Sequence, residues 1–154
     1  MKFMDRRYLA GLIDGEGCIQ SKGKKHAGVK LTIANSYKPL IEMLYNEFGG
    51  GIREYIDKRP YKSGRFRKPV YHWAIYDIKA EDILRKCYPY LIVKKEQAKI
   101  MFSIRKNINT NYYRVPSNEL KRRVSLKNEL DKLNKKGVSP FELAQKNKGV
   151  KYNG

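Results

Sequence analysis

Apolar residues recur along this chain with two different periods, and the order in which those periods alternate constrains the fold most. Residues 28–35 and 70–77 alternate apolar side chains with small or polar ones. A period of two is typical of strands that bury one face and expose the other. Residues 5–13 and 38–48 instead repeat apolar side chains every three to four positions, which predicts helices.

The predicted elements alternate between helices and hairpins through about residue 106. Helices are expected at 5–13, 38–48, 79–87 and 94–106, and hairpins pair 18–24 with 28–35 and 52–58 with 70–77. Gly15 and Gly17 are expected to end the first helix, because glycine weakens helices. This αββαββα order with antiparallel hairpins is an α+β fold, whose sheet should present one polar face as an open saddle.

The remainder of the chain reads as C-terminal helices. A polar loop is expected at 107–116 and a helix at 118–135. Ser139-Pro140-Phe141-Glu142 resembles a capping box that starts another short helix, and a basic tail follows. We therefore interpret 1–106 as the core domain and 107–154 as a helical extension of the same domain.

The charge of the chain indicates a polyanionic partner. Lys and Arg number 34 against 15 Asp and Glu, which gives a formal net charge of +19. Nucleic acid is the first candidate partner and an anionic membrane surface is the second, because a compact chain with this charge repels itself. No apolar run reaches transmembrane length, so no membrane association is expected. Charge alone does not distinguish an enzyme from a ribosomal or chromatin protein.

The cysteines and the first residues indicate an intracellular protein. Cys18 and Cys87 have no paired metal-ligand spacing, which predicts reduced thiols and no structural zinc. Residues 1–7 lack an apolar run of signal-peptide length. The expected location is the cytoplasm, or an organelle if the chain is encoded there.

One nine-residue segment joins a predicted helix to residues that suit a catalytic site. It reads Leu9-Ala10-Gly11-Leu12-Ile13-Asp14-Gly15-Glu16-Gly17. Gly11 and Gly15 are four residues apart, so they share one helix face and allow another backbone to approach closely. Glu16 falls where the helix meets the strand. An exposed carboxylate there is suited to Mg²⁺, which is held by one or two carboxylates, water and phosphate oxygens.

This segment resembles the signature of the LAGLIDADG homing endonuclease family in seven of nine letters, with Gly15 in place of alanine and Glu16 in place of aspartate. The resemblance implies that Gly15 and Glu16 hold the metal and that two motif helices pack side by side. Because the chain has one copy of the motif, the resemblance implies a homodimer. Its implied interface residues are Leu9, Ala10, Gly11, Leu12, Asp14 and Gly15. For Asp14, helix packing or capping is the competing interpretation.

Two further positions match patterns of the family. Lys94, in the segment from Pro89 to Ala98, resembles an active-site lysine at the start of a helix, and Lys95 is the competing choice. Asn35 closes the second strand, where relatives often carry Gln or Asn to position solvent. The resemblance therefore implies catalytic roles for Glu16, Lys94 and Asn35.

Both hairpins carry basic and polar side chains on the face that should point away from the helices. A two-stranded ribbon fits the DNA major groove, where such side chains read base edges, while loop lysines hold phosphates. The predicted DNA-binding residues are Gln20, Lys22, Lys24, Lys25, Lys30, Thr32, Arg53, Tyr55, Arg59, Lys62, Arg65, Arg67 and His72.

Together these features predict a site-specific homing endonuclease. It is expected to make double-strand breaks in a long, roughly palindromic DNA target by Mg²⁺-dependent phosphodiester hydrolysis, as a homodimer with no small-molecule substrate. Two alternatives stay open: an intron RNA maturase, and a non-catalytic DNA-binding regulator with the same fold.

Overall fold

A computed structural model describes residues 4–23, 27–108 and 114–135. The predicted helix after Ser139, the basic tail, and Lys24 and Lys25 lie outside these ranges. The elements are α1 (Arg6–Glu16), β1 (Gly17–Lys22), β2 (Gly28–Asn35), α2 (Lys38–Phe48), β3 (Gly51–Tyr55), β4 (Val70–Tyr76), α3 (Asp77–Cys87), the 3₁₀ turn η1 (Tyr88–Tyr90), α4 (Lys95–Arg105) and α5 (Ser117–Leu133).

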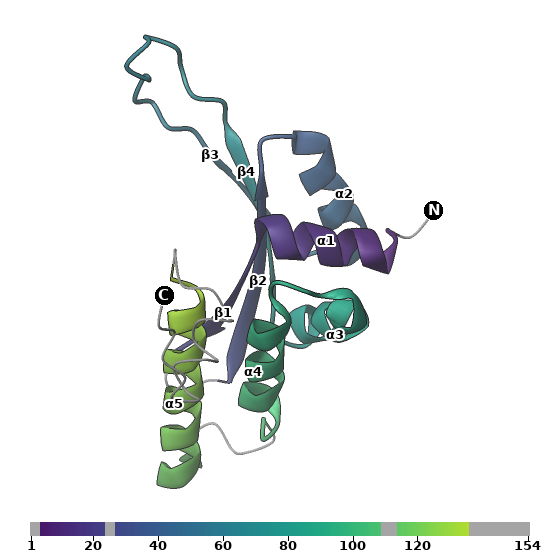
Figure 1. The fold of residues 1–154 in the computed structure, drawn as a ribbon, viewed down its shortest axis with the longest axis vertical. Helices are drawn as coiled ribbons and strands as arrows, with labels where there is room; N and C mark the ends of the chain where they lie inside the picture. Colours follow the sequence, from purple (N-terminus) through teal and green to yellow (C-terminus); the bar gives the residue numbers. More distant parts are fainter. Residues whose placement is uncertain (1–3, 24–26, 109–113, 136–154) are drawn as a thin grey trace, which may run out of the picture.

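The α+β class and the antiparallel hairpins are confirmed. The four strands form one antiparallel sheet in the order β1-β2-β4-β3. Helices α1, α2, α3 and α4 gather on one side of this sheet (Figure 1). In the described part of the chain, no helix is both long and apolar enough to span a membrane.

Helix α1 extends further than the sequence analysis predicts. Asp5 caps its start by accepting hydrogen bonds from the backbone N–H groups of Arg7 and Tyr8, at 2.8 and 3.2 Å. The expectation that Gly15 ends the helix is wrong, because the helix continues to Glu16. Gly17 does end it, and a Cβ at Gly17 would lie 2.5 Å from the Ile13 carbonyl oxygen. The change from helix to strand therefore falls directly after Glu16.

The core lies between the sheet and the helices, as the period-two pattern predicts. Leu31, Ile33 and Trp73 are fully buried on the helix side of the sheet. The Trp73 indole Nε1 donates a hydrogen bond to the Gly49 carbonyl at 2.7 Å. Next to it, Gly50 has a φ of +92° and comes so close to β4 that a Cβ would lie 2.4 Å from the Ala74 oxygen. Trp73 and this glycine turn thus fix the start of β3 against β4.

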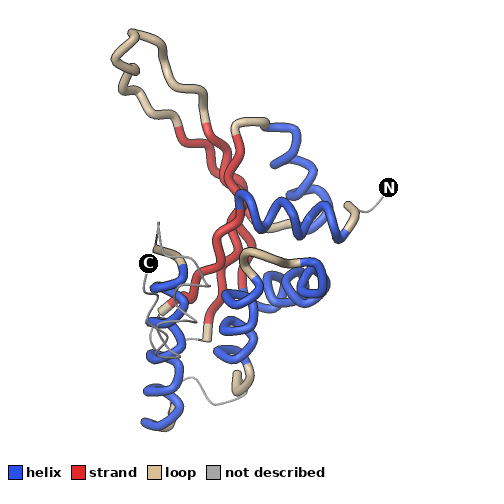
Figure 2. The backbone as a smooth tube through the Cα atoms, in the orientation of Figure 1, coloured by secondary structure: helices blue, strands red, loops and turns tan. Residues whose placement is uncertain are grey.

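The two outer strands of the sheet differ in their surroundings. Helix α5 lies beside β1 (Figure 2), where Leu130 joins the core and Asn134 donates a side-chain hydrogen bond to the Ile19 carbonyl at 2.8 Å. All five residues of β3 are exposed. The β1 edge is therefore covered, whereas the β3 edge is open.

A charged cluster attaches α5 to the end of α4. Glu119 is buried and accepts hydrogen bonds from Arg122 and Arg123 at 2.8 Å each. These partners, Arg122 first, lower the pKa of Glu119 to about 2. Arg122 also donates to the Ser103 carbonyl at 2.7 Å. The position of α5 thus depends on an ionised Glu119.

A buried arginine anchors the residue that precedes β2. The Arg105 side chain is 1% exposed and pairs with Glu81 of α3. It also donates to the Ala27 carbonyl at 2.9 Å. Asp77 accepts a hydrogen bond from the Val29 amide at 3.1 Å in the same region. These contacts hold β2 in place against α3 and α4.

Candidate functional site

The end of α1 is attached to the segment that precedes α4. The Asp14 carboxylate accepts hydrogen bonds from the backbone amides of Ile92 and Lys94, at 2.8 and 2.9 Å. In return the Lys94 ammonium donates to the Asp14 carbonyl at 2.5 Å. Asp14 therefore positions the helix end, as its competing interpretation proposes, and its carboxylate is already occupied by two N–H groups.

Glu16 contrasts with Asp14, because its carboxylate is exposed and forms no hydrogen bond or ion pair within the described ranges. It is the last residue of α1, where the helix dipole places partial negative charge. A carboxylate in that position is unfavourable unless a cation lies near it. The structure therefore presents Glu16 as an unpaired acid beside a helix end that favours positive charge.

The backbone at this helix end supplies a second oxygen. Of the last carbonyls of α1, which have no partner inside the helix, that of Ile13 accepts the Gly17 N–H and that of Asp14 accepts Lys94. The Gly15 carbonyl has no partner among the described residues. Gly15 and Glu16 thus offer a carbonyl and a carboxylate, which are ligands suited to Mg²⁺.

These two groups make only part of a metal site. No cluster of three or more His, Cys, Asp or Glu able to hold a metal occurs in the described part of the chain. Mg²⁺ usually keeps several waters and takes phosphate oxygens from its substrate. The donor set therefore fits a divalent cation that completes its coordination with water and phosphate oxygens.

Of the two adjacent lysines, the structure brings Lys94 to the motif. The Lys95 ammonium instead contacts the Tyr88 ring, 5.3 Å from its centre. Asn35 has a local partner, since its Oδ1 accepts a hydrogen bond from the Tyr37 amide at 2.8 Å. Tyr37 directly precedes α2. Gly17 pairs with Ile33, which places the Asn35 end of β2 near the α1–β1 junction. Catalytic roles for Lys94 and Asn35 stay predictions.

The face of the sheet that points away from α1–α4 brings most of the predicted DNA-binding residues together. Strand alternation puts the buried Ile19, Leu31 and Ile33 on the other face. Cross-strand pairing places Gln20 opposite Lys30. On this open face lie Gln20, Lys22, Lys30, Thr32, Arg53, Tyr55 and His72.

A hollow crosses the open face, and its electrostatics favour an anion. Its lining includes Lys22, Lys30, Arg53 and His72, and no acidic residue lines it. The Lys22 ammonium lies 4.3 Å from the centre of the Tyr76 ring. This contact holds the cation over the sheet, where a phosphate or a base edge can reach it.

The loop between β3 and β4, residues 56–69, extends beyond the sheet as an arm (Figure 1). Arg59 and Arg67, both predicted DNA contacts, instead pair with Asp57 at 2.9 and 3.2 Å. The hydrogen bonds from Arg59 lower the pKa of Asp57 to about 2. Lys62 and Arg65 are exposed and form no ion pair within the described residues. The arm therefore contains both paired and available cations.

Helix α5 contributes to this surface in a way that the sequence analysis missed. Lys127, Asn134 and Lys135 line a hollow together with Gln20 and Lys30 of the sheet. The basic composition of the predicted helix at 118–135 was visible in the sequence. Its docking beside β1 was not, because that contact depends on distant residues.

The exposed strip of α1 includes Tyr8, Gly11 and Gly15, whereas Leu12 beside it is half-buried and packs against the core. A Cβ at Gly11 or Gly15 would meet nothing within 4 Å, and the Tyr8 side chain is 56% exposed. The predicted interface needs a correction. Leu9 and Ala10 are 3% and 0% exposed and lie in the subunit's own core, so their side chains are not available to a partner.

The fold and the site define a basic α+β protein with a cation-lined sheet face and two oxygen donors at the end of α1. The sequence matches the LAGLIDADG-like domain over residues 4–128. This match covers most of the chain, and the chain therefore belongs to the LAGLIDADG family. No curated protein matches it.

Solved homing endonucleases share the fold at low sequence identity. The chain is similar to I-CvuI in complex with the I-CreI target, with a TM-score of 0.60 and 20% identity over 96% of each chain. It is similar to the archaeal intron-encoded I-Vdi141I complexed with DNA, with a TM-score of 0.62 and 21% identity over 91% of this chain and 90% of that one. It is also similar to a double mutant of I-SmaMI, with a TM-score of 0.61 and 19% identity over 96% of this chain and 50% of that one.

Proposed function

We propose that the chain is one subunit of a homodimeric homing endonuclease that makes double-strand breaks in a long, roughly palindromic DNA target. The observation that carries this proposal is the unpaired Glu16 carboxylate at the end of α1, beside a sheet face lined by cations. Solved structures with this fold include I-CvuI and I-Vdi141I bound to DNA. The family match and this geometry support a DNA-cleaving enzyme.

Dimerisation completes the metal site in this proposal. Ile92 and Val93, which are 84% and 53% exposed, belong to the segment attached to α1 between Gly11 and Gly15. Asp14 holds these residues beside α1 through the Ile92 amide. A twofold contact places the same patch of each subunit against itself. Two α1 helices packed on this patch bring two Glu16 carboxylates close to the twofold axis.

Glu16 and the Gly15 carbonyl hold Mg²⁺ in this proposal. When bound there, Mg²⁺ would supply the Lewis acidity needed to activate water and to stabilise the leaving oxygen of a phosphodiester. I-CvuI complexes with DNA were solved in the presence of Mg and of Ca, which supports the choice of a divalent cation. The Asp14 carboxylate contributes by fixing the segment that carries Lys94, rather than by binding the ion.

Lys94 supplies positive charge to the reacting phosphate. Its ammonium lies at the Asp14 carbonyl, two residues before Glu16. An ammonium has three donors, so two N–H bonds stay available for oxygens that gain charge in the transition state. Asn35, at the neighbouring end of β2, is assigned to positioning solvent through the part of its amide that does not bind Tyr37.

The open face of the sheet binds the DNA. Its strands follow the major groove, and Gln20, Lys30, Arg53 and His72 reach base edges. Lys135 after α5, together with Lys62 and Arg65 of the arm, holds phosphates at the two ends of this face, whereas Lys127 is paired with Asp131 at 2.6 Å. One subunit reads one half of the target.

The test is Glu16→Gln, which keeps the shape of the side chain and removes its charge. Targets are selected from a randomised duplex library by cleavage with the purified protein and Mg²⁺. Glu16→Gln should abolish cleavage and leave DNA affinity within a few-fold of the wild type. The control is Glu129→Gln, which changes an exposed acid of α5 and should cut normally.

Two outcomes would contradict the proposal. Substantial cleavage by the purified Glu16→Gln protein refutes Glu16 as the metal ligand. Tight DNA binding by the wild-type protein without cleavage indicates a non-catalytic regulator, and selective binding of intron RNA without DNA cleavage indicates a maturase.

A further inference from the structure

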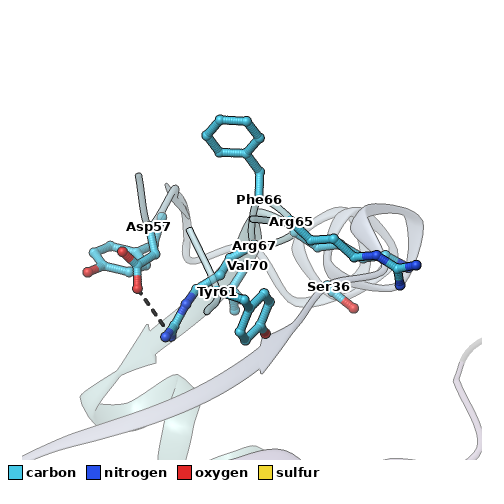
Figure 3. Close-up of a pocket in the computed structure, with 9 residues that line it drawn as sticks. Ser36, Asp57, Tyr61, Arg65, Phe66, Arg67 and Val70 are labelled. Atoms are coloured by element: carbon cyan, nitrogen blue, oxygen red, sulfur yellow. Dashed lines mark ion pairs between the residues drawn. The ribbon is translucent and has the colours of Figure 1, made fainter. Parts of the chain in front are cut away.

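Phe66 occupies an unusual place for an apolar side chain. It is 79% exposed, more than any other aromatic residue in the described part of the chain. Phe66 is one of the residues that line a hollow on the arm, and its ring points away from the other labelled side chains (Figure 3). It lies on the arm beyond the end of the sheet, so the core of the subunit does not require it.

The arm around Phe66 is braced by its own contacts. The Tyr61 amide donates to the Arg65 carbonyl at 2.9 Å, and the Gly64 amide donates to the Tyr61 carbonyl at 2.8 Å. Gly64 has a φ of +77°, a conformation that favours glycine in such a turn. These two bonds close the turn directly before Phe66.

Asp57 braces the other side of the arm. It pairs with Arg67 at 3.2 Å (Figure 3), and the Arg67 guanidinium lies 4.8 Å from the centre of the Tyr61 ring. Asp57 also binds Arg59 through two side-chain hydrogen bonds. Arg67 is thus used inside the arm, and Phe66 is presented outward from a preformed scaffold.

The charge around Phe66 matches a DNA backbone. Arg65 precedes the ring, Lys68 follows it two residues later, and Lys62 lies in the same turn, all exposed and without an ion pair in the described ranges. An exposed apolar ring flanked by available cations is the pattern of a side chain that enters a base step while its neighbours hold phosphates.

We propose that Phe66 is a wedge that inserts between two base pairs at the outer end of each half-site. Arg65 and Lys68 bind the phosphates that flank the opened step. The proposal rests on the DNA-binding function proposed above, and it adds a contact outside the sheet face. In this proposal the protein prefers sequences at this position that unstack easily. Flexible pyrimidine–purine steps are therefore favoured.

The test uses duplexes selected for binding, not for cleavage, by the Glu16→Gln protein. In one series a mismatch, which weakens stacking, is moved through the outer part of the half-site. Because opening a base step costs free energy that a mismatch has already reduced, a mismatch at the wedge position should tighten binding by about tenfold or more. Phe66→Ala should lose this gain, and Phe66→Leu should keep most of it, because an aliphatic wedge also separates base pairs.

A fluorescent base analogue provides an independent readout. With 2-aminopurine at the same step, fluorescence should rise on binding of the Phe66-containing protein and stay low with Phe66→Ala. The control is Ile78→Ala, which removes a side chain 74% exposed on α3 and should behave like the starting protein. Thermal unfolding verifies that each variant is folded.

The outcomes separate this proposal from the endonuclease proposal. The wedge is overturned if a mismatch tightens binding equally for the protein with Phe66 and for Phe66→Ala, even if wild-type protein cleaves DNA. Wild-type protein that binds and unstacks DNA without cutting it supports the wedge and contradicts the nuclease. Absence of any duplex binding overturns both.

Discussion

Gly11 offers a test in which subunit stability and dimerisation should move in opposite directions. It lies within α1, has no positive φ, and an added Cβ would meet nothing within 4 Å. The isolated subunit therefore gains nothing from glycine at this position. In the proposed dimer, by contrast, a bare backbone is what allows the partner helix to approach.

The magnitudes follow from these two environments. Glycine in a helix interior is about 1 kcal/mol less favourable than alanine, so Gly11→Ala should raise the Tm of the monomer by about 2–4 °C for a chain of this size. Overpacking costs about 1–3 kcal/mol per site, and a twofold interface contains the substitution twice. The dimer dissociation constant should then rise by at least about 30-fold.

The assay is thermal unfolding at several protein concentrations, combined with sedimentation and cleavage. Dimerisation makes the Tm rise with protein concentration, so the wild-type Tm should increase steeply with concentration. At low concentration the Tm of Gly11→Ala should be higher than that of the wild type and should change little with concentration. Asn128→Ala on α5 is the control for helix propensity and should keep the wild-type concentration dependence.

Two results would refute this reasoning. A lower Tm for Gly11→Ala at every concentration would mean that the subunit itself requires the glycine. An unchanged concentration dependence, with normal cleavage, would place α1 outside the dimer interface.

Three further predictions concern other parts of the site and the fold. Lys94→Ala should lower the single-turnover cleavage rate far more than affinity, whereas Lys95→Ala should have little effect on that rate because its ammonium contacts a tyrosine ring elsewhere. Replacing both Lys62 and Arg65, which are exposed and assigned to phosphates, by glutamine should make the log–log salt dependence of DNA binding shallower by up to about 2, at about 0.9 per phosphate contact. The pKa of Glu119 is lowered from 4.5 to about 2 in the folded chain, so its contribution to stability is present above pH 4.5 and lost as pH falls toward 2; urea unfolding of Glu119→Gln should show a flatter decline in that window.

The sequence was sufficient to predict the elements that depend on local patterns. The bounds of β2 and α2 agree with the alternating and helical periods of residues 28–35 and 38–48. The placement of Lys22 and Lys30 on one face follows from strand alternation. These features needed no knowledge of distant contacts.

The sequence was insufficient where a side chain has a choice of partners. Asp14 and Glu16 are two acids of one motif, yet only the structure shows that Asp14 binds two amides. Arg67 looked like an available cation because Asp57 is separated from it by ten positions in the chain, and proximity alone did not show that Asp57 also pairs with Arg59. Burial of Leu9 and Ala10 likewise depends on the direction in which α1 faces the sheet.

The unequal edges of the sheet limit how copies of this chain can associate. An open strand edge is a template for pairing with another chain, and a covered edge is not. With β1 closed by the Asn134 contact and β3 open, edge pairing joins at most two sheets and leaves no free edge for a third. Such pairing would also bring two cationic arms together, and their repulsion opposes it. One covered edge and a net charge of +19 therefore both oppose the fibrous association of copies of this chain.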